Sequence, residues 1–365
     1  MINLDFMPSK SLALYLVRLF LTRTLAVLVL LVMVLMALDL LGESGKILAV
    51  PGNGEAELWH YVSLRVPLLI QRFLPFSALL GTLIAFTSLN QHSEVISMKA
   101  AGLSAHQILA PLIVASLGLA ALAFAFNEGV AVNSARMVNA WNDNDYRPIR
   151  ATSGVLSNVW IKAGDDLVHA NIASGRGSGL QLQGVTIYDR SGGELGRVID
   201  AERAVQAVGG WRLEQVRTYD TAMNVILRQK EVMALPGVTP DRFTLAKVNP
   251  DERDFIDLRT DIADLEAAGR PSDEARAGLW HKISGPLSIM LMPLLAAVAA
   301  FGLARSGQVL IRAAAGMALG FAYFVVDNLS LALGNTGAYP AWLAAWAPFV
   351  LFLLIGEAVL VRSEE

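Results

Sequence analysis

Six stretches of this 365-residue chain contain no Asp, Glu, Lys or Arg, and each is long enough or nearly long enough to cross a lipid bilayer. A transmembrane helix needs about 20 mainly apolar residues. Two of the stretches are shorter than the lower limit of about 17 residues, but arginines at their margins can extend their charged ends to the interface. Only 17% of the residues are charged, so we predict an α-helical membrane protein with six transmembrane helices. The stretches are 24–38, 73–89, 100–127, 283–304, 313–326 and 328–356.

The positions of lysine and arginine predict the orientation of these helices. Six spans place both chain ends on one side, and short cytoplasmic loops are enriched in basic residues. The side with the chain ends carries seven such residues, against Lys46 and Arg65 in the short loops opposite. We therefore expect the termini to be cytoplasmic. The seven residues are Lys10, Arg18, Arg23, Lys99, Arg305, Arg312 and Arg362.

A long segment of different character separates the third and fourth predicted spans. Pieces with partial apolar and polar alternation, or with many β-branched residues, are separated there by Gly-rich turns. This pattern predicts an all-β domain at residues 128–250, jelly-roll-like or a sandwich, on the periplasmic side. It is inserted between two transmembrane halves, 1–127 and 280–365, with an amphipathic connector at 251–279. The expected strands are 155–161, 166–172, 182–188, 195–201, 211–219 and 225–235.

A short polar segment, residues 90–103, links the second and third predicted spans. Gly102 can end a helix, and Ser104 with Gln107 forms a capping box that starts the next one. We predict a rigid coupling helix at the membrane face, on which a soluble motor protein could push. The alternative is an ordinary loop in which Glu94 is a solvated acid. The candidate coupling residues are Glu94, Val95, Met98, Ala101 and Gly102.

The sequence shows no catalytic motif. It contains no HExxH, CxxC or GxSxG pattern, and its five histidines lack metal-ligand spacing. The fragment 42–46 resembles a phosphate-binding loop, but the first glycine of that motif is missing, and Ile47 stands where Ser or Thr binds Mg²⁺. We expect a non-catalytic chain with no cofactor or metal of its own and no nucleic-acid partner.

Several segments, in this order and spacing, resemble the LptF/LptG permeases of the bacterial lipopolysaccharide exporter, and LptG more closely than LptF. The resemblance implies a multi-pass protein of the Gram-negative inner membrane that pairs with an LptF-like permease. It also implies an LptB-like ATPase dimer, which binds the ATP and Mg²⁺, and an LptC-like bridge protein that receives the lipopolysaccharide from the β domain. The segments are 93–102, 159–162, 211–213, 279–283 with 286–288, and 320–327.

The chain departs from this family at the outer end of the first span. Family members usually carry several basic residues there for the phosphates of lipid A, whereas this chain has mainly apolar and acidic residues. Other cations are the candidate lipid contacts. Arg72 is the strongest candidate because it lies just inside the predicted interface, where an unpaired cation costs free energy. Snorkelling to lipid headgroups is the alternative for Arg72. The candidates are Lys46, Arg65, Arg72 and Arg136.

Three further expectations remain open. Val155, Val159 and Ile161, in the first predicted strand, would line a lipid trough or the domain core. Asp327 is expected to pack or cap its helix rather than relay protons. As a whole, the chain is expected to be a transport subunit. The alternatives are a membrane-anchored scaffold or sensor that transports nothing, and a permease for another anionic lipid.

Overall fold

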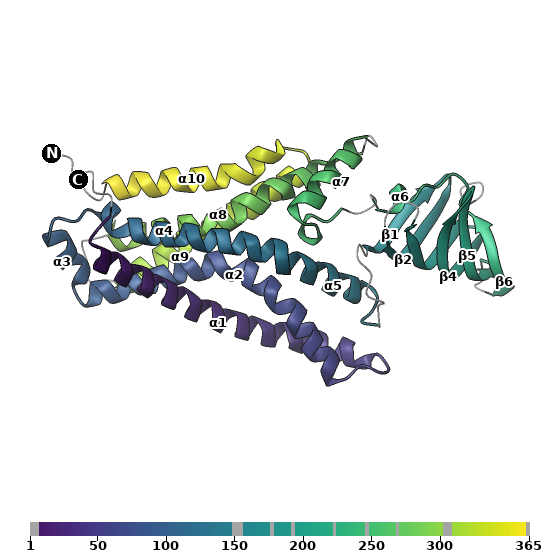
Figure 1. Ribbon diagram of the computed structural model, residues 1–365, viewed down its shortest axis with the longest axis horizontal. Helices are drawn as coiled ribbons and strands as arrows, with labels where there is room; N and C mark the ends of the chain where they lie inside the picture. The colour runs from purple at the N-terminus through teal and green to yellow at the C-terminus, as the bar shows by residue number, and fades with distance from the viewer. Residues whose placement is uncertain are drawn as a thin grey trace.

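The computed structural model shows a bundle of long helices with a β domain at one end (Figure 1). It describes residues 7–147, 156–175, 179–190, 194–221, 224–244, 248–267, 270–301 and 309–362. Within these residues six helices are long and apolar enough to cross a membrane, which confirms the predicted number. Their bounds by this criterion are Lys10–Ala49, Glu55–Gln91, Ala105–Asp143, Asp273–Val298, Ala314–Asn335 and Ala341–Arg362.

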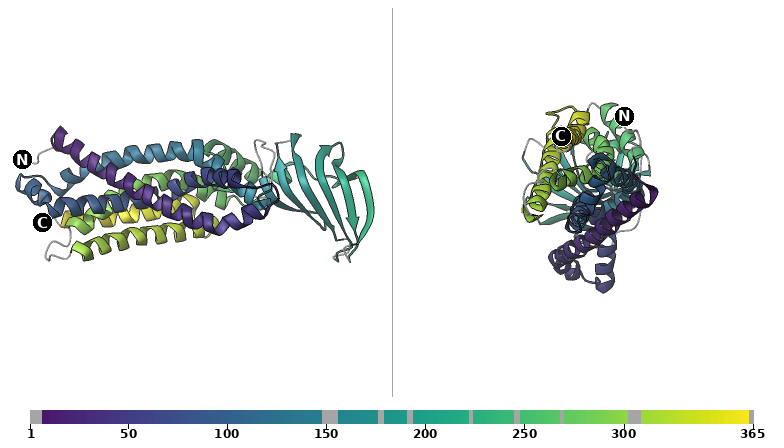
Figure 2. Two further views of the ribbon diagram at one scale, coloured as in Figure 1. Left: turned by 90° about the horizontal axis from the view of Figure 1, so that it is seen from below. Right: turned by 90° about the vertical axis from the view of Figure 1, so that its left-hand side faces the viewer.

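The order of elements places the β domain between the third and fourth of these helices, as predicted. The short helix α3 lies at the opposite end of the bundle, where α1 begins and α10 ends (Figures 1 and 2). The helices are α1 (Lys10–Ala49), α2 (Glu55–Gln91), α3 (Glu94–Ala100), α4 (Ala105–Phe126), α5 (Val132–Asp143), α6 (Asp241–Thr244), α7 (Phe255–Ala267), α8 (Asp273–Phe301), α9 (Val309–Asn335) and α10 (Ala341–Arg362), with a 3₁₀ turn η4 at Pro250–Glu252.

Small residues let the helices of the bundle approach closely. A Cβ atom on Gly81 of α2 would lie 2.6 Å from the backbone nitrogen of Thr24 in α1, so these two helices touch through their backbones. Gly320 of α9 lies against the side chain of Leu79 in the same way. Close contacts of this kind hold membrane helices together, because in lipid the hydrophobic effect does not drive helices to associate.

The third membrane helix is longer than the sequence predicts. A π-helical turn, Asn127–Ala131, joins α4 to α5, and the helix continues to Asp143 rather than ending at residue 127. Glu128 in this turn explains the difference. Its carboxylate accepts hydrogen bonds from Lys282 Nζ at 2.8 Å and from the backbone N–H of Phe255 at 2.5 Å. We expected the span to end just before the charge of Glu128. Lys282 neutralises that charge within the fold, so the helix continues past it.

Two other boundaries also shift. The coupling helix, α3, has seven residues and is shorter than the predicted segment 90–103. The helix α8 begins at Asp273, within the segment predicted as the connector, and only α7 forms the amphipathic part of that connector. The capping box at Ser104 and Gln107 is confirmed, and Gly102 adopts φ +90°, which a glycine accommodates easily.

The β domain is one antiparallel sheet whose six strands follow each other in chain order. Its all-β character is confirmed, and each described strand pairs with the next in a meander of hairpins. The inner face is filled by side chains, including Trp211 and Phe243 of α6, which are both 0% exposed. The strands are β1 (Leu156–Ala163), β2 (Asp166–Ser174), β3 (Gln181–Asp189), β4 (Arg197–Ala207), β5 (Gly210–Tyr219) and β6 (Val225–Ala234).

A crease crosses this sheet. Alternate strands carry one residue with positive φ, at Asn158 (52°), Gly184 (61°) and Gln215 (56°). Strand pairing is interrupted at these positions and continues in the same register on both sides. On β3, for example, the buried residues are Leu182 before the crease and Val185 after it, an odd spacing. At the crease the alternation of side chains shifts by one residue. The buried side chains on both sides of the crease therefore point to the same inner face of the sheet.

Candidate lipid groove and coupling elbow

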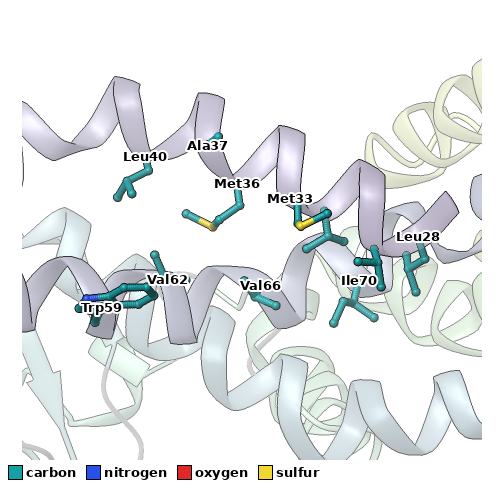
Figure 3. A pocket seen from close by; sticks show the side chains of 11 residues that line it. Leu28, Met33, Met36, Ala37, Leu40, Trp59, Val62, Val66 and Ile70 are labelled. Atoms are coloured by element: carbon teal, nitrogen blue, oxygen red, sulfur yellow. The ribbon is translucent and has the colours of Figure 1, made fainter. Parts of the chain in front are cut away.

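An apolar groove of about 490 Å³ lies between α1 and α2. Side chains from the two helices face each other across it, with Met33 and Met36 on one side and Val62 and Val66 on the other (Figure 3). Methionine adapts its shape to irregular apolar partners. The lining is entirely apolar apart from the indole nitrogen of Trp59 and consists of Leu28, Val29, Val32, Met33, Met36, Ala37, Leu40, Trp59, Val62, Val66 and Ile70.

The groove crosses the level at which the membrane ends. The uncharged part of α1 ends at Leu38, and Asp39 follows it directly. We expect the membrane interface near this first charge after the apolar run. Groove residues lie on both sides of that level, and beyond it Trp59 is 72% exposed. Such a surface suits an apolar chain that is leaving a bilayer.

An ionic cluster, which we call the rim, lies on α1 and α2 beside the end of the groove that is nearer the loop between them. Asp39 accepts two hydrogen bonds from the guanidinium of Arg65, at 2.9 and 3.0 Å. It also accepts one from the Tyr61 hydroxyl at 2.7 Å. Arg65 precedes the groove residue Val66, and Asp39 already neutralises its charge.

A second acid continues this rim. Glu43 accepts hydrogen bonds from Lys46 Nζ at 2.9 Å and from the Tyr146 hydroxyl at 2.8 Å. Burial and the bond to Glu43 raise the pKa of Tyr146, so its proton stays in place. The Lys46 side chain is 64% exposed, so its ion pair with Glu43 is weak and the ammonium can turn to another anion.

The two remaining candidate cations lie elsewhere. Arg136 donates both its Nε and Nη2 hydrogens to the backbone carbonyl of Glu252, at 3.2 and 3.0 Å. It thereby fixes the connector to α5. Arg72 is exposed, and within the described residues no hydrogen bond or ion pair joins it to another side chain. Of the four candidates, Lys46 and Arg65 form ion pairs with the rim acids Glu43 and Asp39.

The predicted coupling residues divide into two groups. Val95 and Met98 are 4% and 8% exposed and belong to the core of the bundle, so they pack α3 against the membrane helices. Ala101 and Gly102 are exposed at the end of α3. Glu94 accepts a hydrogen bond from the Tyr15 hydroxyl at 2.9 Å. Residues 93–104, which we call the elbow, are therefore attached to α1, the helix that forms one wall of the groove.

The predicted trough residues lie in the closed interior of the β domain. Val159 is 0% and Ile161 is 9% exposed, both within the core of the sheet. Val155 lies outside the described residues. In this conformation the two described side chains therefore form core.

Asp327 is buried within α9, and its carboxylate lies 3.9 Å from His281 Nε2 of α8. Asn328, the neighbour expected to act with it, instead donates to the carbonyl of Phe324. This arrangement fits packing between α8 and α9. Among the described residues no group of three or more His, Cys, Asp or Glu side chains could hold a metal ion.

The residue pattern alone does not predict the groove, and the bond between Asp39 and Arg65 was not expected from it. A signal for the bond was present. The loop between α1 and α2 is short, so residues at equal distances from it face each other across the helical hairpin. Counting outward from that loop brings Asp39 to the level of Arg65. The groove itself depends on how far the helices separate, which the residue pattern does not specify.

Six membrane helices, an inserted β domain, an apolar groove open at the membrane surface and an elbow at the opposite face define a polytopic membrane protein of the lipid-transporter class. The chain belongs to the family described as lipopolysaccharide export system permease LptF/LptG, whose model matches residues 14–362.

Among curated proteins, the chain is 28% identical over 315 residues to the lipopolysaccharide export system permease protein LptG of Escherichia coli strain K12. That match covers 83% of this chain and 85% of the relative. The LptG protein of Haemophilus influenzae is 25% identical over 331 residues, covering 86% of this chain and 89% of the relative. The predicted resemblance to this family, and to LptG within it, is confirmed.

Proposed function

We propose that this chain is a permease subunit that takes lipopolysaccharide from the inner membrane into the groove between α1 and α2 and releases it toward its β domain. The single observation that carries the proposal is the apolar groove between α1 and α2, with the ionic rim beside it. Acyl chains would occupy the groove, and phosphate groups would meet Lys46 at the rim. The family membership and the LptG relatives support this substrate.

The proposal includes an orientation and three partners. We place α3 and both termini in the cytoplasm and the β domain in the periplasm, because basic residues concentrate on the α3 side. An LptB-like ATPase dimer would bind at α3 and supply the free energy, since the one segment that resembles a phosphate-binding loop departs from that motif. An LptF-like permease would complete the cavity, and an LptC-like protein would receive the lipid.

Photo-crosslinking in intact cells tests the site. A photoreactive amino acid at Met33, inside the groove, should capture lipopolysaccharide, and capture should rise when the ATPase is inactive. The matched control is Leu354 of α10, which is 62% exposed on another face of the bundle. Bulk phospholipid should label both positions equally. Equal capture of lipopolysaccharide at Met33 and Leu354 would contradict the proposed site.

Cysteine labelling tests the orientation, because the native chain contains no cysteine. An impermeant thiol reagent added to intact spheroplasts should modify a cysteine at Gln206 in the β domain and leave one at Ser93 unmodified. The reverse pattern would show that the orientation is wrong.

One observation favours a second substrate. Because Asp39 neutralises Arg65, the rim offers less free positive charge than a basic cluster would. A glycolipid with fewer phosphates than lipid A would match this rim better. Mass spectrometry of the lipid captured at Met33 distinguishes the two substrates, since it reports the phosphate count directly.

A further inference from the structure

The outer face of the β sheet carries a continuous row of aromatic and polar side chains. Directly paired residues on neighbouring strands place their side chains on the same face. The core row next to it, which includes Val159 and Ala170, is fully buried, so the polar row faces outward. Strand by strand from β1 to β6, the row is Trp160, His169, Thr186, Asp200, Arg217 and Arg228.

Trp160 presents a fixed aromatic surface at one end of this row. Its ring stacks on His169, with centroids 4.4 Å apart and an angle of 29°, and on Tyr188, with centroids 5.8 Å apart. The indole nitrogen donates to Asn158 Oδ1 at 3.1 Å, and His169 Nε2 lies 2.9 Å from the same oxygen. Trp160 nevertheless remains 49% exposed. A ring held in place before binding loses little conformational entropy when it binds.

The crease in the sheet positions this aromatic end. Asn158 has φ 52°, a conformation that asparagine accepts more readily than most residues. In that conformation its side-chain oxygen reaches both ring nitrogens. The oxygen is an acceptor for the Trp160 N–H, and it therefore also favours the His169 tautomer that carries its hydrogen on Nε2.

Two arginines stand at the other end of the row. Arg217 and Arg228 are directly opposite each other on β5 and β6, where like charges destabilise strand pairing. Arg217 has acidic neighbours, Asp200 on the paired strand and Glu202 at 3.7 Å. Arg228 is exposed, and within the described residues no ion pair joins it to an acid. An anion between the two guanidinium groups would relieve their repulsion, and phosphate suits their geometry.

We propose that this outward row binds a phosphorylated oligosaccharide, with a sugar ring on Trp160 and a phosphate near Arg217 and Arg228. Aromatic rings bind the apolar faces of sugars, and Thr186 with Asp200 supplies hydrogen-bonding groups between the two ends. Five steps between strands span about 24 Å, enough for several linked sugars. The proposal rests on the proposed function, since the ligand would be the saccharide part of the transported glycolipid.

In this arrangement one glycolipid uses two surfaces of the chain. Its acyl chains follow the groove in the membrane, and its sugars follow the outer face of the sheet. The interior of the sheet, filled by core side chains in this conformation, is not needed for the saccharide contact.

Binding to the full chain in lipid nanodiscs tests the proposal. The probe is a fluorescently labelled oligosaccharide from lipopolysaccharide with all acyl chains removed, used with and without its phosphates. Trp160→Ala should raise the Kd of both probes about fivefold to tenfold, because an aromatic contact contributes about 1 to 1.5 kcal/mol. Trp160→Phe should retain part of the affinity.

Arg228→Gln should raise the Kd of the phosphorylated probe about tenfold and leave that of the dephosphorylated probe unchanged. The matched control is Arg212→Gln, an exposed arginine of β5 on the other side of the crease, which should change neither value. Absence of binding by the unaltered chain, or equal affinity of the Trp160→Ala variant, would overturn the proposal.

Two further results separate the alternatives. If a partner protein protects Trp160 from oxidation while the oligosaccharide does not, the row is a protein interface and the saccharide proposal is wrong. A Val62→Trp variant should block crosslinking at Met33 in the groove without changing the Kd of the oligosaccharide. The proposed lipid site in the groove and the proposed saccharide site on the outer face are therefore tested independently.

Discussion

The hydroxyl of Tyr15 donates a hydrogen bond of 2.9 Å to the carboxylate of Glu94, and it connects two parts of the chain with different tasks. Tyr15 belongs to α1, which forms one wall of the groove, and Glu94 begins α3 at the elbow. Val95 and Met98 seat the same helix in the bundle. A force applied to α3 would therefore reach the groove wall directly through α1, in addition to its effect on α2 and α4.

Tyr15→Phe tests this connection. The variant removes one hydrogen bond near the surface, so the free energy of unfolding should change by about 1 kcal/mol or less. Lipid release per ATP hydrolysed, measured in proteoliposomes with the ATPase partner, should fall severalfold. Tyr339→Phe, at the opposite end of the bundle, is the control and should leave this ratio unchanged. An unaltered ratio in Tyr15→Phe would show that α1 does not transmit the force.

Glu94 variants test the coupling site itself. Glu94→Ala removes the acceptor of Tyr15 and any charge-assisted contact with a partner, each contributing about 1 to 3 kcal/mol. Glu94→Lys should be worse because it adds repulsion toward a basic partner. Both variants should fold and insert normally, since surface substitutions seldom cost much stability. Normal copurification with the ATPase and normal transport by Glu94→Lys would show that α3 is not a coupling site and only connects α2 to α4.

The pair Glu128 and Lys282 should be essential for stability. Their side chains are 18% and 6% exposed, and they are 2.8 Å apart. Glu128→Gln leaves a buried ammonium without its counter-ion and should lower the free energy of unfolding by about 3 to 5 kcal/mol.

Adding Lys282→Met to Glu128→Gln should restore most of this loss, because it removes the uncompensated charge. Arg197→Gln, which breaks the more exposed ion pair with Asp189, should cost less than about 1 kcal/mol. Thermal unfolding in detergent measures all four proteins. A loss in Glu128→Gln no larger than that in Arg197→Gln would contradict the prediction.

The contact between Gly81 and Thr24 predicts opposite effects of one substitution at two glycines. Gly81→Ala places a methyl group 2.6 Å from a backbone atom of α1, so the helices must separate, at a cost of about 1 to 3 kcal/mol. Gly118→Ala in α4 meets no atom within 4 Å and should stabilise its helix by up to about 1 kcal/mol. Equal effects on the unfolding temperature would mean that α1 and α2 are not in close contact.

The sequence predicted the membrane helices and the inserted β domain because runs of apolar residues and breaks in charge are local signals. It predicted the capping box at Ser104 for the same reason. Boundaries were less accurate where a charge had a distant partner, as Glu128 has in Lys282. The strand pattern was only partly alternating because the crease at Gly184 and its neighbours inverts the alternation. Contacts between helices decide which of the candidate lipid cations pair with acids near the groove. No local sequence pattern encodes those contacts.

His169 should titrate below its ordinary pKa of 6.5. Burial on the sheet beside Trp160 and Tyr188 disfavours the imidazolium and lowers the pKa of His169. The unfolded chain therefore binds a proton at a pH where the folded chain does not. The free energy of unfolding should be highest above pH 6.5 and should decrease as the pH falls below 6.5 toward the lowered value.

His169→Gln should remove this part of the pH dependence, because glutamine does not titrate. NMR of the chain labelled with ¹³C-histidine measures the pKa, and the variant assigns the signal among the five histidines. His92, exposed next to the elbow, is the internal comparison. A pKa of His169 at or above 6.5, or the same loss of stability on acidification in His169→Gln, would show that the stacked ring is open to water and the aromatic end of the row is not rigid.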